Sequence, residues 1–361
     1  MLQKKIVSII GTVGVPAQYG GFETLVENII GDNCSPGIQY IIYCSKKFYT
    51  IKKESYKGAI LRYVNLNANG IQSIVYDIIS LIKASRNSDT ILVLGVSGCC
   101  FLPLYRVFSK KKLVINIDGL EHKREKWNKY IRFFLKFSER MAIKYGDTII
   151  TDNKGIQDYV LKEYNKKSEL IAYGGDHVLQ ESDKNFESSI LKKYDLIPNN
   201  YSLSICRIEP ENNIHITLEA FKKNKKNLVF IGNWNKNEYG KQLLKQYKQC
   251  NNILMLAPIY DSKILNAFRN NCSNYIHGHS AGGTNPSLVE AMFYAKPILA
   301  YDVIYNRETT HNKALYYNND VTLNICLSQI KDSNIMGQNL LEIAKNEYKW
   351  DFIAKQYEKL Y

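Results

Sequence analysis

The hydrophobic pattern of the chain alternates between short, continuous apolar runs and segments with helical spacing. In the first half, apolar runs predict strands at residues 6–10, 40–44, 91–94, 113–117 and 148–150, and amphipathic spacing predicts helices at 22–30, 73–84 and about 126–145. Continuous apolar strands that alternate with helices are typical of a parallel sheet with both faces covered. The first half is therefore predicted to be an α/β domain.

The second half repeats this alternation after a polar segment. Residues 177–200 are rich in Ser, Asp, Lys and Asn, which we interpret as a linker region with one short helix. Beyond it the pattern predicts strands at 202–206, 228–231, 253–256, 274–276 and 297–300, and helices at 214–221, 239–247 and after Pro286. We expect two Rossmann-like doubly wound domains, residues 1–180 and 181–345. Such sheets bind ligands at the carboxyl ends of their strands, so the loops after the strands are the candidate sites.

Composition agrees with two buried cores and adds one unusual feature. A chain of 361 residues with 45% hydrophobic and 23% charged residues is neither disordered, collagenous nor a coiled coil. Its 48 Lys+Arg against 34 Asp+Glu give a formal net charge of +14, which predicts an anionic partner. The eight cysteines lack C-x-x-C spacing, which favours free thiols and a reducing cytosol. The uncharged apolar stretch at residues 90–105 is shorter than the roughly 18–20 residues that span a bilayer.

A glycine-rich loop follows the first strand and opens a helix. Gly11 and Gly14 allow the backbone to approach a ligand, and the helix N-terminus offers unpaired N–H groups. The glycines are spaced G-x-x-G, unlike the dinucleotide fingerprint, and Lys46-Lys47 follow Cys44-Ser45 where a ribose-binding carboxylate is expected. An NAD enzyme is therefore disfavoured. Tight turns without a ligand are the structural alternative for this loop.

A second glycine-rich loop precedes the helix that starts near Pro286. Its polar residues Thr284, Asn285 and Ser287 can cap that helix, whose N–H groups suit a diphosphate. Glu290 lies about one turn further along, where a carboxylate can accept a hydrogen bond from a sugar hydroxyl. A carboxylate that only stabilises the helix start is the alternative for Glu290.

An arginine follows the first strand of the second half, in Cys206-Arg207-Ile208-Glu209-Pro210-Glu211-Asn212. A guanidinium at the carboxyl end of a strand can bind phosphate oxygens through two parallel hydrogen bonds. The alternative is a salt bridge from Arg207 to Glu209 or Glu211.

Five sequence stretches together resemble a known enzyme family over essentially the whole chain. R-x-x-P-E-x-N from Arg207, a glycine-rich loop opening a helix with a Glu, and a terminal amphipathic segment with Trp350 resemble retaining, nucleotide-sugar-dependent glycosyltransferases of the GT-B fold. G-T-x-G-V-P-A-x-Y-G-G-F-E, D-G-L-E-x-K-R-x-K-W and G-G-T-N-P-S-L-V-E-A-M resemble bacterial rhamnosyltransferases of capsule and cell-wall polysaccharide assembly. The resemblance implies two Rossmann-like domains facing across a cleft, with residues 346–361 forming a helix that crosses back to the N-terminal domain.

The resemblance also implies roles for single residues. Glu290 would hydrogen-bond the nucleotide ribose, and Arg207 would neutralise the donor diphosphate. The chain departs from the broader family at Gly282, where a second carboxylate is usual, and at Asn212, where a Lys usually accompanies the Arg. Gly11, Gly14, Asn212, Thr284, Asn285 and Ser287 complete the donor-binding candidates.

The implied reaction retains the anomeric configuration and uses neither a metal nor a cofactor besides the nucleotide-sugar substrate. The sequence agrees, because it has no D-x-D and no cluster of His, Asp and Glu with the spacing of metal ligands. Asp118 and Glu121 follow the last apolar strand before the long helix and are the catalytic candidates, for contact with acceptor or sugar hydroxyls. For Asp118, a cap on the following turn is the alternative.

The positive charge is concentrated in one part of the first half. Residues 101–150 carry twelve basic and five acidic residues, with aromatic side chains between the charges, as in helices that lie on anionic lipid. The membrane- or acceptor-binding candidates are Lys123, Arg124, Lys126, Lys129, Arg132, Phe133, Lys136 and Phe137. A solvated helix face with inward-packed aromatics is the alternative. Nucleic acid is a disfavoured partner, because no recognition fold accompanies the charge.

These observations lead to one expected function and two alternatives. We expect transfer of rhamnose from dTDP-rhamnose to a lipid-diphosphate-linked sugar, with glucose as the expected sugar, at the cytoplasmic face of the cell membrane, with the enzyme bound peripherally. The alternatives are a transferase that uses a UDP-hexose donor and a non-catalytic sugar-nucleotide-binding protein.

Overall fold

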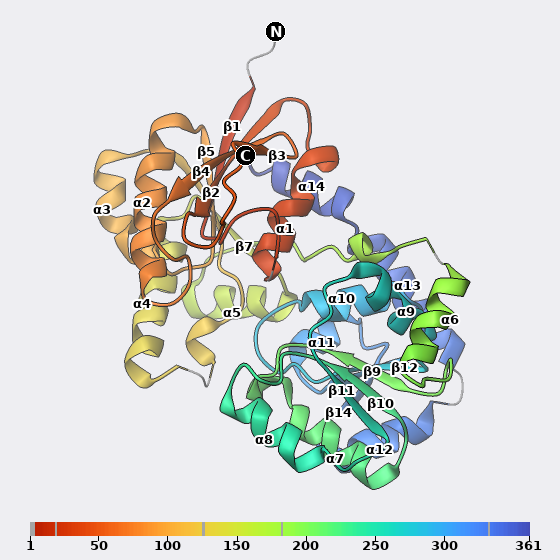
Figure 1. The fold of residues 1–361 in the computed structure, drawn as a ribbon. Coiled ribbons are helices and arrows are strands. Elements are labelled where there is room, and N and C mark those ends of the chain that lie inside the picture. The colour runs from red at the N-terminus through yellow and green to blue at the C-terminus, as the bar shows by residue number, and fades with distance from the viewer. Residues whose placement is uncertain (1–3, 19, 125–126, 182, 331–332) are drawn as a thin grey trace. The chain divides into compact units, whose positions relative to one another are not determined.

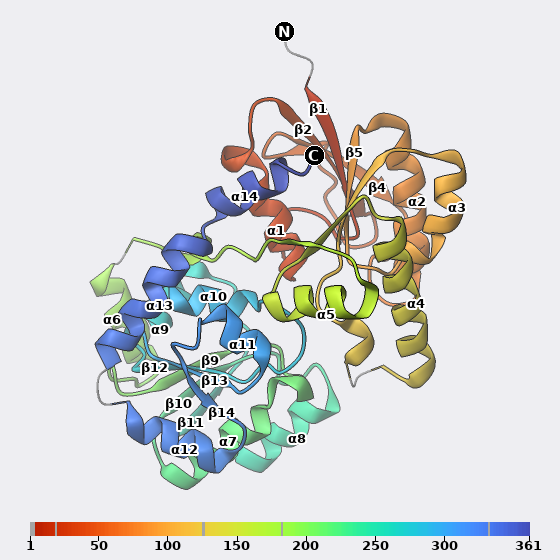
Figure 2. The same ribbon diagram turned by 180° about the vertical axis from the view of Figure 1, so that it is seen from behind.

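The computed structural model describes residues 4–361 except 19, 125–126, 182 and 331–332. The chain forms two units, each with its own parallel sheet (Figures 1 and 2). Unit 1 comprises the residues up to Tyr173 together with Trp350–Tyr361, and unit 2 is Gly174–Lys349. All eight cysteines are free thiols.

Unit 1 is built on a sheet with the strand order β3-β4-β2-β1-β5-β6-β7-β8. The strands are β1 (Lys5–Ile10), β2 (Ile38–Ser45), β3 (Ser55–Tyr56), β4 (Ala59–Val64), β5 (Thr90–Leu94), β6 (Lys112–Asn116), β7 (Thr148–Thr151) and β8 (Glu169–Leu170). Neighbouring strands are parallel, apart from the antiparallel hairpin of β3 and β4. The order reverses between β1 and β5, so the loops after these strands meet at the switch point of the sheet.

Helices cover both faces of this sheet, as its continuous apolar strands predict. They are α1 (Gly21–Ile29), α2 (Gln72–Asn87), α3 (Leu102–Phe108), α4 (Lys129–Tyr145), α5 (Lys154–Tyr164) and α14 (Trp350–Glu358), with 3-10 turns η1 (Gly31–Asn33), η2 (Cys99–Phe101) and η3 (Glu121–Lys123). Both views place α2, α3 and α4 on one face and α1 and α14 on the other (Figures 1 and 2). Leu25, Val26 and Trp350 are buried in the core between α1, α14 and the sheet.

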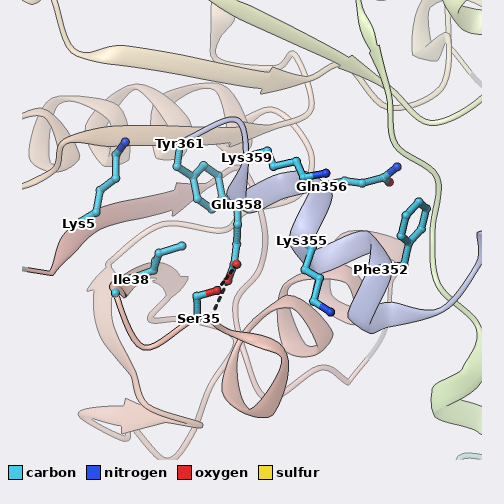
Figure 3. A pocket seen from close by; sticks show the side chains of 10 residues that line it. Lys5, Ser35, Ile38, Phe352, Lys355, Gln356, Glu358, Lys359 and Tyr361 are labelled. Carbon is cyan, nitrogen blue, oxygen red and sulfur yellow. Dashed lines mark hydrogen bonds between the residues drawn. The ribbon is translucent and has the colours of Figure 1, made fainter.

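The C-terminal helix α14 is fixed to unit 1 by polar contacts as well as by its core side chains. The Glu358 carboxylate accepts hydrogen bonds from the Ser35 hydroxyl and from the Ser35 N–H, the latter at 2.7 Å (Figure 3). A cavity of about 530 Å³ opens beside this contact, with Lys5, Lys355 and Tyr361 among its lining residues. β1 and β2 begin beside this cavity. The cavity therefore lies at the amino ends of the strands, opposite to the loops that follow the strands.

A buried hydrogen bond between α14 and β6 gives a first testable prediction. Asn116 Nδ2 donates to the Tyr357 hydroxyl at 2.8 Å, and both side chains are buried. Tyr357→Phe leaves the Asn116 amide without this acceptor, so we expect the free energy of unfolding to fall by about 1–3 kcal/mol. Urea denaturation measures the loss. Lys355→Ala, on the exposed face of α14, is the matched control and should change stability by less than about 0.5 kcal/mol; equal stability of Tyr357→Phe and wild type would contradict the assignment.

Unit 2 has the strand order β11-β10-β9-β12-β13-β14. Its strands are β9 (Ser202–Ile205), β10 (Leu228–Ile231), β11 (Ile253–Leu256), β12 (Asn274–His277), β13 (Ile298–Tyr301) and β14 (Leu315–Tyr317), all parallel to their neighbours. Its helices are α6 (Lys184–Lys193), α7 (Ile214–Asn224), α8 (Glu238–Tyr247), α9 (Ser262–Asn271), α10 (Pro286–Met292), α11 (Ile304–Thr309), α12 (Asp320–Gln329) and α13 (Ser333–Glu347), with 3-10 turns η4 (Asp176–Val178) and η5 (Pro210–Asn212). The order reverses between β9 and β12, which makes the loops after these two strands neighbours.

The two-domain α/β prediction is confirmed, and the structure corrects several details within it. The helix expected over about 126–145 begins at Lys129, because Asn128 Oδ1 caps it by accepting the N–H groups of Tyr130 and Ile131 at 3.1 and 3.0 Å. Tyr130, in the first turn of this helix, is 74% exposed. The buried residues of α4 are Ser138, Glu139, Ala142 and Ile143.

The polar segment 177–200 is part of the folded unit 2. It contains α6, whose first turn is capped by Asp183, and α6 packs against α9. The hydrophobic pattern did not predict β4, α3, α5 or α9, which are short or lack a continuous apolar run.

Candidate functional site

The candidate site of unit 2 lies where the loops after β9 and β12 meet. The structure brings together the two segments that the sequence singled out separately. Asn213 Nδ2 donates to the Gly278 carbonyl at 2.9 Å, and Ser280 N–H donates to the Glu211 carbonyl at 2.9 Å. A Cβ on Gly278 would lie 2.1 Å from the Asn212 carbonyl oxygen. A glycine is therefore required at position 278 by this close approach of the two loops.

Asn212 is the centre of this junction. Its side chain is buried; Nδ2 donates to the Arg207 carbonyl at 2.6 Å, and Oδ1 lies 2.6 Å from Nδ1 of His279. His279 is in turn held through its carbonyl, which accepts a hydrogen bond from Asn306 Nδ2 at 2.9 Å. Asn212 therefore acts as a positioning residue that connects the arginine loop to the glycine-rich loop.

The role of Asn212 can be tested by truncation. Asn212→Ala removes both hydrogen bonds of a buried side chain, so we expect unit 2 to lose about 1–3 kcal/mol of stability. Because the Arg207 carbonyl then loses its hydrogen bond to the junction, the Arg207 loop is held less precisely, and turnover should fall between about ten- and a hundred-fold. Initial rates and thermal denaturation measure the two effects. Asn235→Ala, on an exposed loop of the same unit, is the control that should change neither.

Arg207 lies between β9 and Asn212, and its side chain is exposed. Among the described residues, it forms no salt bridge with Glu209 or Glu211, the alternative partners considered from the sequence. Glu209 instead lies 3.9 Å from the ammonium group of Lys236. The guanidinium therefore stands at the carboxyl edge of the sheet with its hydrogen-bonding capacity directed at solvent.

Glu290 lies within α10, and its carboxylate has partners within unit 2. Arg269 of α9 donates a hydrogen bond to Oε2, and His177 Nε2 lies 3.6 Å from Oε1. Burial alone would lower the pKa of the Arg269 guanidinium, but the Glu290 carboxylate raises it above its usual value. Arg269 and His177 were not identified from the sequence, because no motif connects α9 or η4 with α10. The capping interpretation does not describe this carboxylate, whose partners are side chains of other elements.

The start of α10 is capped as its sequence suggests. Asn285 Oδ1 accepts the Ser287 N–H at 3.0 Å and the Ser287 hydroxyl at 2.8 Å. Thr284, just before this cap, is buried. The side chains of Asn285 and Ser287 thus hold the turn that connects the glycine-rich loop to the helix.

Two side chains at the ends of β9 and β12, the partly buried Cys206 and the buried His277, are held neutral. Burial lowers the pKa of His277 to about 3, and its Nε2 has no hydrogen-bond partner among the described residues. Burial raises the pKa of the Cys206 thiol to about 12. At neutral pH the His277 imidazole is therefore uncharged, and Cys206 is a thiol rather than a nucleophilic thiolate.

The glycines of the first loop, in unit 1, have a packing reason. A Cβ on Gly11 would lie 2.0 Å from the Leu94 carbonyl oxygen, and one on Gly14 would lie 2.5 Å from Cys44 Sγ. Glu23 organises the loop, because its Oε1 accepts the Thr12 hydroxyl and the Val13 N–H, both at 2.8 Å. Glu23 ends the motif G-T-x-G-V-P-A-x-Y-G-G-F-E, but its role in the loop was not predicted from the sequence.

Asp118 and Glu121 lie just after β6 in unit 1. Asp118 has a left-handed backbone with φ of 60°, and its N–H donates to Asn116 Oδ1 at 2.9 Å. The Glu121 carboxylate pairs with Arg124 at 2.8 Å and accepts the Trp127 indole N–H at 3.2 Å. Glu121 therefore organises the loop between β6 and α4, and the Arg124 guanidinium faces this loop, with its side chain only 11% exposed.

The other membrane- or acceptor-binding candidates divide into a group that contacts Tyr159 and an outward group. Lys136 bonds the Tyr159 hydroxyl and pairs with Glu163 at 2.9 Å, and Lys123 lies over the Tyr159 ring at 4.7 Å. The outward group consists of Lys129, Arg132, Phe133 and Phe137, of which the two phenylalanines are 77% and 44% exposed. Lys126 lies outside the described residues.

No group of three or more His, Cys, Asp or Glu residues in the described part of the chain is arranged to hold a metal ion. None of the described helices combines the length and the apolar character needed to cross a bilayer.

Family comparisons assign the two halves of the chain to different models. Residues 4–176 match the model described as "Domain of unknown function (DUF1972)", and residues 189–321 match "Glycosyl transferases group 1". No curated protein matches the chain in a sequence comparison.

Solved structures resemble the chain over nearly its whole length. Sucrose-phosphate synthase from Thermosynechococcus elongatus has a TM-score of 0.80 at 13% identity, covering 99% of this chain and 98% of that one. Anabaena HepE in complex with UDP-glucose has a TM-score of 0.77 at 14% identity, covering 98% of each chain. A glycosyltransferase from Rickettsia africae has a TM-score of 0.70 at 16% identity, covering 99% and 97%. The chain therefore has the two-domain GT-B fold of these structures, and its residues 189–321 match a family of glycosyltransferases.

Proposed function

We propose that this glycosyltransferase moves rhamnose from dTDP-rhamnose to a lipid-diphosphate-linked sugar, glucose being the expected acceptor, in the synthesis of a capsule or cell-wall polysaccharide. The junction of the Arg207 loop with the glycine-rich loop at the switch point of unit 2 carries the proposal. It holds a solvent-directed guanidinium at the carboxyl edge of a doubly wound sheet, where an anionic nucleotide substrate is expected.

The chemistry follows from the charge that develops on the leaving group. Transfer breaks the bond between the anomeric carbon and the diphosphate oxygen, and forms a bond from that carbon to the acceptor hydroxyl oxygen with retained configuration. The proton of the acceptor hydroxyl passes to the departing diphosphate. Negative charge builds on the departing nucleoside diphosphate. Arg207 and the backbone N–H groups of the loop before Asn285 stabilise this charge without a metal ion or a cofactor.

Glu290 is the proposed ribose contact. Arg269 and His177 fix its carboxylate, and a carboxylate has acceptor capacity left for one sugar hydroxyl after these contacts. A thymidine donor presents only the 3′-hydroxyl, whereas a uridine donor presents two, so Glu290 alone does not select between the donors. The choice of dTDP-rhamnose rests on the motifs that resemble rhamnosyltransferases.

The acceptor side is assigned to unit 1. Asp118 and Glu121 stand after β6, and α4 exposes Lys129, Arg132 and aromatic side chains that suit an anionic membrane surface. This surface would bring the enzyme to a lipid-linked acceptor at the cytoplasmic face of the cell membrane.

A donor panel tests the function. The purified chain is incubated with one synthetic lipid-diphosphate glucose and, in turn, with dTDP-rhamnose, UDP-glucose and other nucleotide sugars, and products are weighed by mass spectrometry. A product that gains one deoxyhexose only with dTDP-rhamnose is the expected result. A hexose gain from a UDP donor would replace the proposed donor, and binding of nucleotide sugars without any product would favour the non-catalytic alternative.

A further inference from the structure

Helix α3 exposes an apolar face that unit 1 does not cover. Leu102 and Tyr105 are buried against the rest of the unit, with exposures of 1% and 0%. Leu104, Val107 and Phe108 lie on the other side, with exposures of 57%, 81% and 56%. Their spacing of three and four residues places them together on one helix face. We call these three residues the α3 apolar face.

This face is held outward by its attachment to α4. Arg106 donates to the Tyr145 carbonyl at the end of α4, at 3.0 Å from Nε and 2.7 Å from a terminal nitrogen, and pairs with Asp147 at 2.7 Å. The same guanidinium donates to the Lys111 carbonyl at 2.9 Å. These contacts of Arg106 fix α3 against α4 with its apolar face exposed.

Basic residues follow this face in the sequence and lie on the neighbouring helix α4. Lys110 and Lys112 follow α3 directly and are exposed. Helix α4, which packs against α3, adds exposed Arg140 and Lys144 (Figures 1 and 2). An apolar face bordered by cations is the arrangement of helices that insert into the headgroup region of anionic lipid.

We propose that the α3 apolar face inserts into an anionic membrane, with Lys110, Lys112 and the basic residues of α4 on the lipid headgroups. This inference rests on the proposed function for its biological sense, and it adds an anchor that the sequence did not identify. A second copy of the chain is the less favourable occupant, because pairing two such faces brings two rings of positive charge together. Lipid of negative charge instead complements both features of the surface.

Vesicle binding of the full chain tests the anchor. Wild type, Leu104→Ser/Val107→Ser/Phe108→Ser and a matched control, Val321→Ser/Ile325→Ser on the exposed face of α12, are sedimented with phosphatidylcholine vesicles with or without phosphatidylglycerol. We expect wild type and control to bind only the anionic vesicles, and the α3 variant to bind them at least about ten-fold more weakly. Replacing Lys110 and Lys112 by Gln should weaken binding by about five-fold per lysine.

Further measurements distinguish insertion of the α3 apolar face into lipid from attraction of the protein to the lipid surface and from self-association. Tryptophan fluorescence of Phe108→Trp should shift to shorter wavelength on anionic vesicles and be quenched by brominated acyl chains. Equal vesicle binding by wild type and the α3 variant, or an α3 variant that converts a dimer to a monomer with unchanged vesicle binding, would overturn the inference. Turnover of a short-chain, detergent-soluble acceptor reports on the proposed function independently, since it needs no membrane.

Discussion

Glu290→Ala is expected to abolish most of the transferase activity and to destabilise unit 2. Arg269 is almost fully buried, and Glu290 is its counter-charge, so removing the carboxylate leaves an uncompensated buried cation. Such losses cost about 3–5 kcal/mol. If the carboxylate also binds the ribose, donor affinity falls by a further ~1–3 kcal/mol. Denaturant unfolding and calorimetric titration with nucleoside diphosphate measure the two effects.

A double variant separates the structural from the binding contribution. Arg269→Met/Glu290→Gln replaces the buried ion pair by groups of similar size without a stranded charge, so most of the stability should return. Donor affinity should remain weak, because a neutral amide is a poorer acceptor for a sugar hydroxyl than a carboxylate. Recovery of both stability and donor affinity in the double variant would show that Glu290 serves only to neutralise Arg269.

The fold was largely predictable because its signals are local. Runs such as residues 6–10 and 228–231 are continuous and apolar, and strands buried on both faces require such runs. Helix α3 escaped prediction because it combines an inward and an outward apolar face, which leaves no amphipathic pattern. Its exposed side is visible only in the folded unit.

The site was predictable as separate segments but not as a network. Arg207 and Glu290 could be named as candidates from their motifs, because Arg207 follows a strand and Glu290 lies near the start of a helix. Arg269 and His177 could not, since they reach Glu290 from distant positions in the sequence. Gly11 shows the opposite difficulty. The sequence predicts that this glycine makes room for a ligand, but its lack of a side chain also makes room for the neighbouring strand β5.

Arg207→Ala is expected to weaken the binding of nucleoside diphosphate itself and to lower kcat/KM by roughly a hundred-fold or more, because a preorganised cation is removed from the leaving group. Its exposed side chain has no salt bridge among the described residues, so the fold should keep its stability within about 0.5 kcal/mol. Arg207→Lys keeps the charge but loses the planar fork, and should recover only part of the rate.

The matched control for Arg207 is Lys225→Ala. Lys225 is an exposed cation at the end of α7, just before β10 begins. Lys225→Ala therefore removes the same charge from unit 2, but at the amino ends of the strands. Its nucleotide affinity should equal that of wild type. Equal affinity in Arg207→Ala would instead mean that the diphosphate is held elsewhere, whereas equal losses in both variants would reduce the effect to net charge. A loss confined to Arg207 is the outcome that its position requires, since its carbonyl is bonded to Asn212 at the junction of the two loops, whereas Lys225 lies at the other ends of the strands.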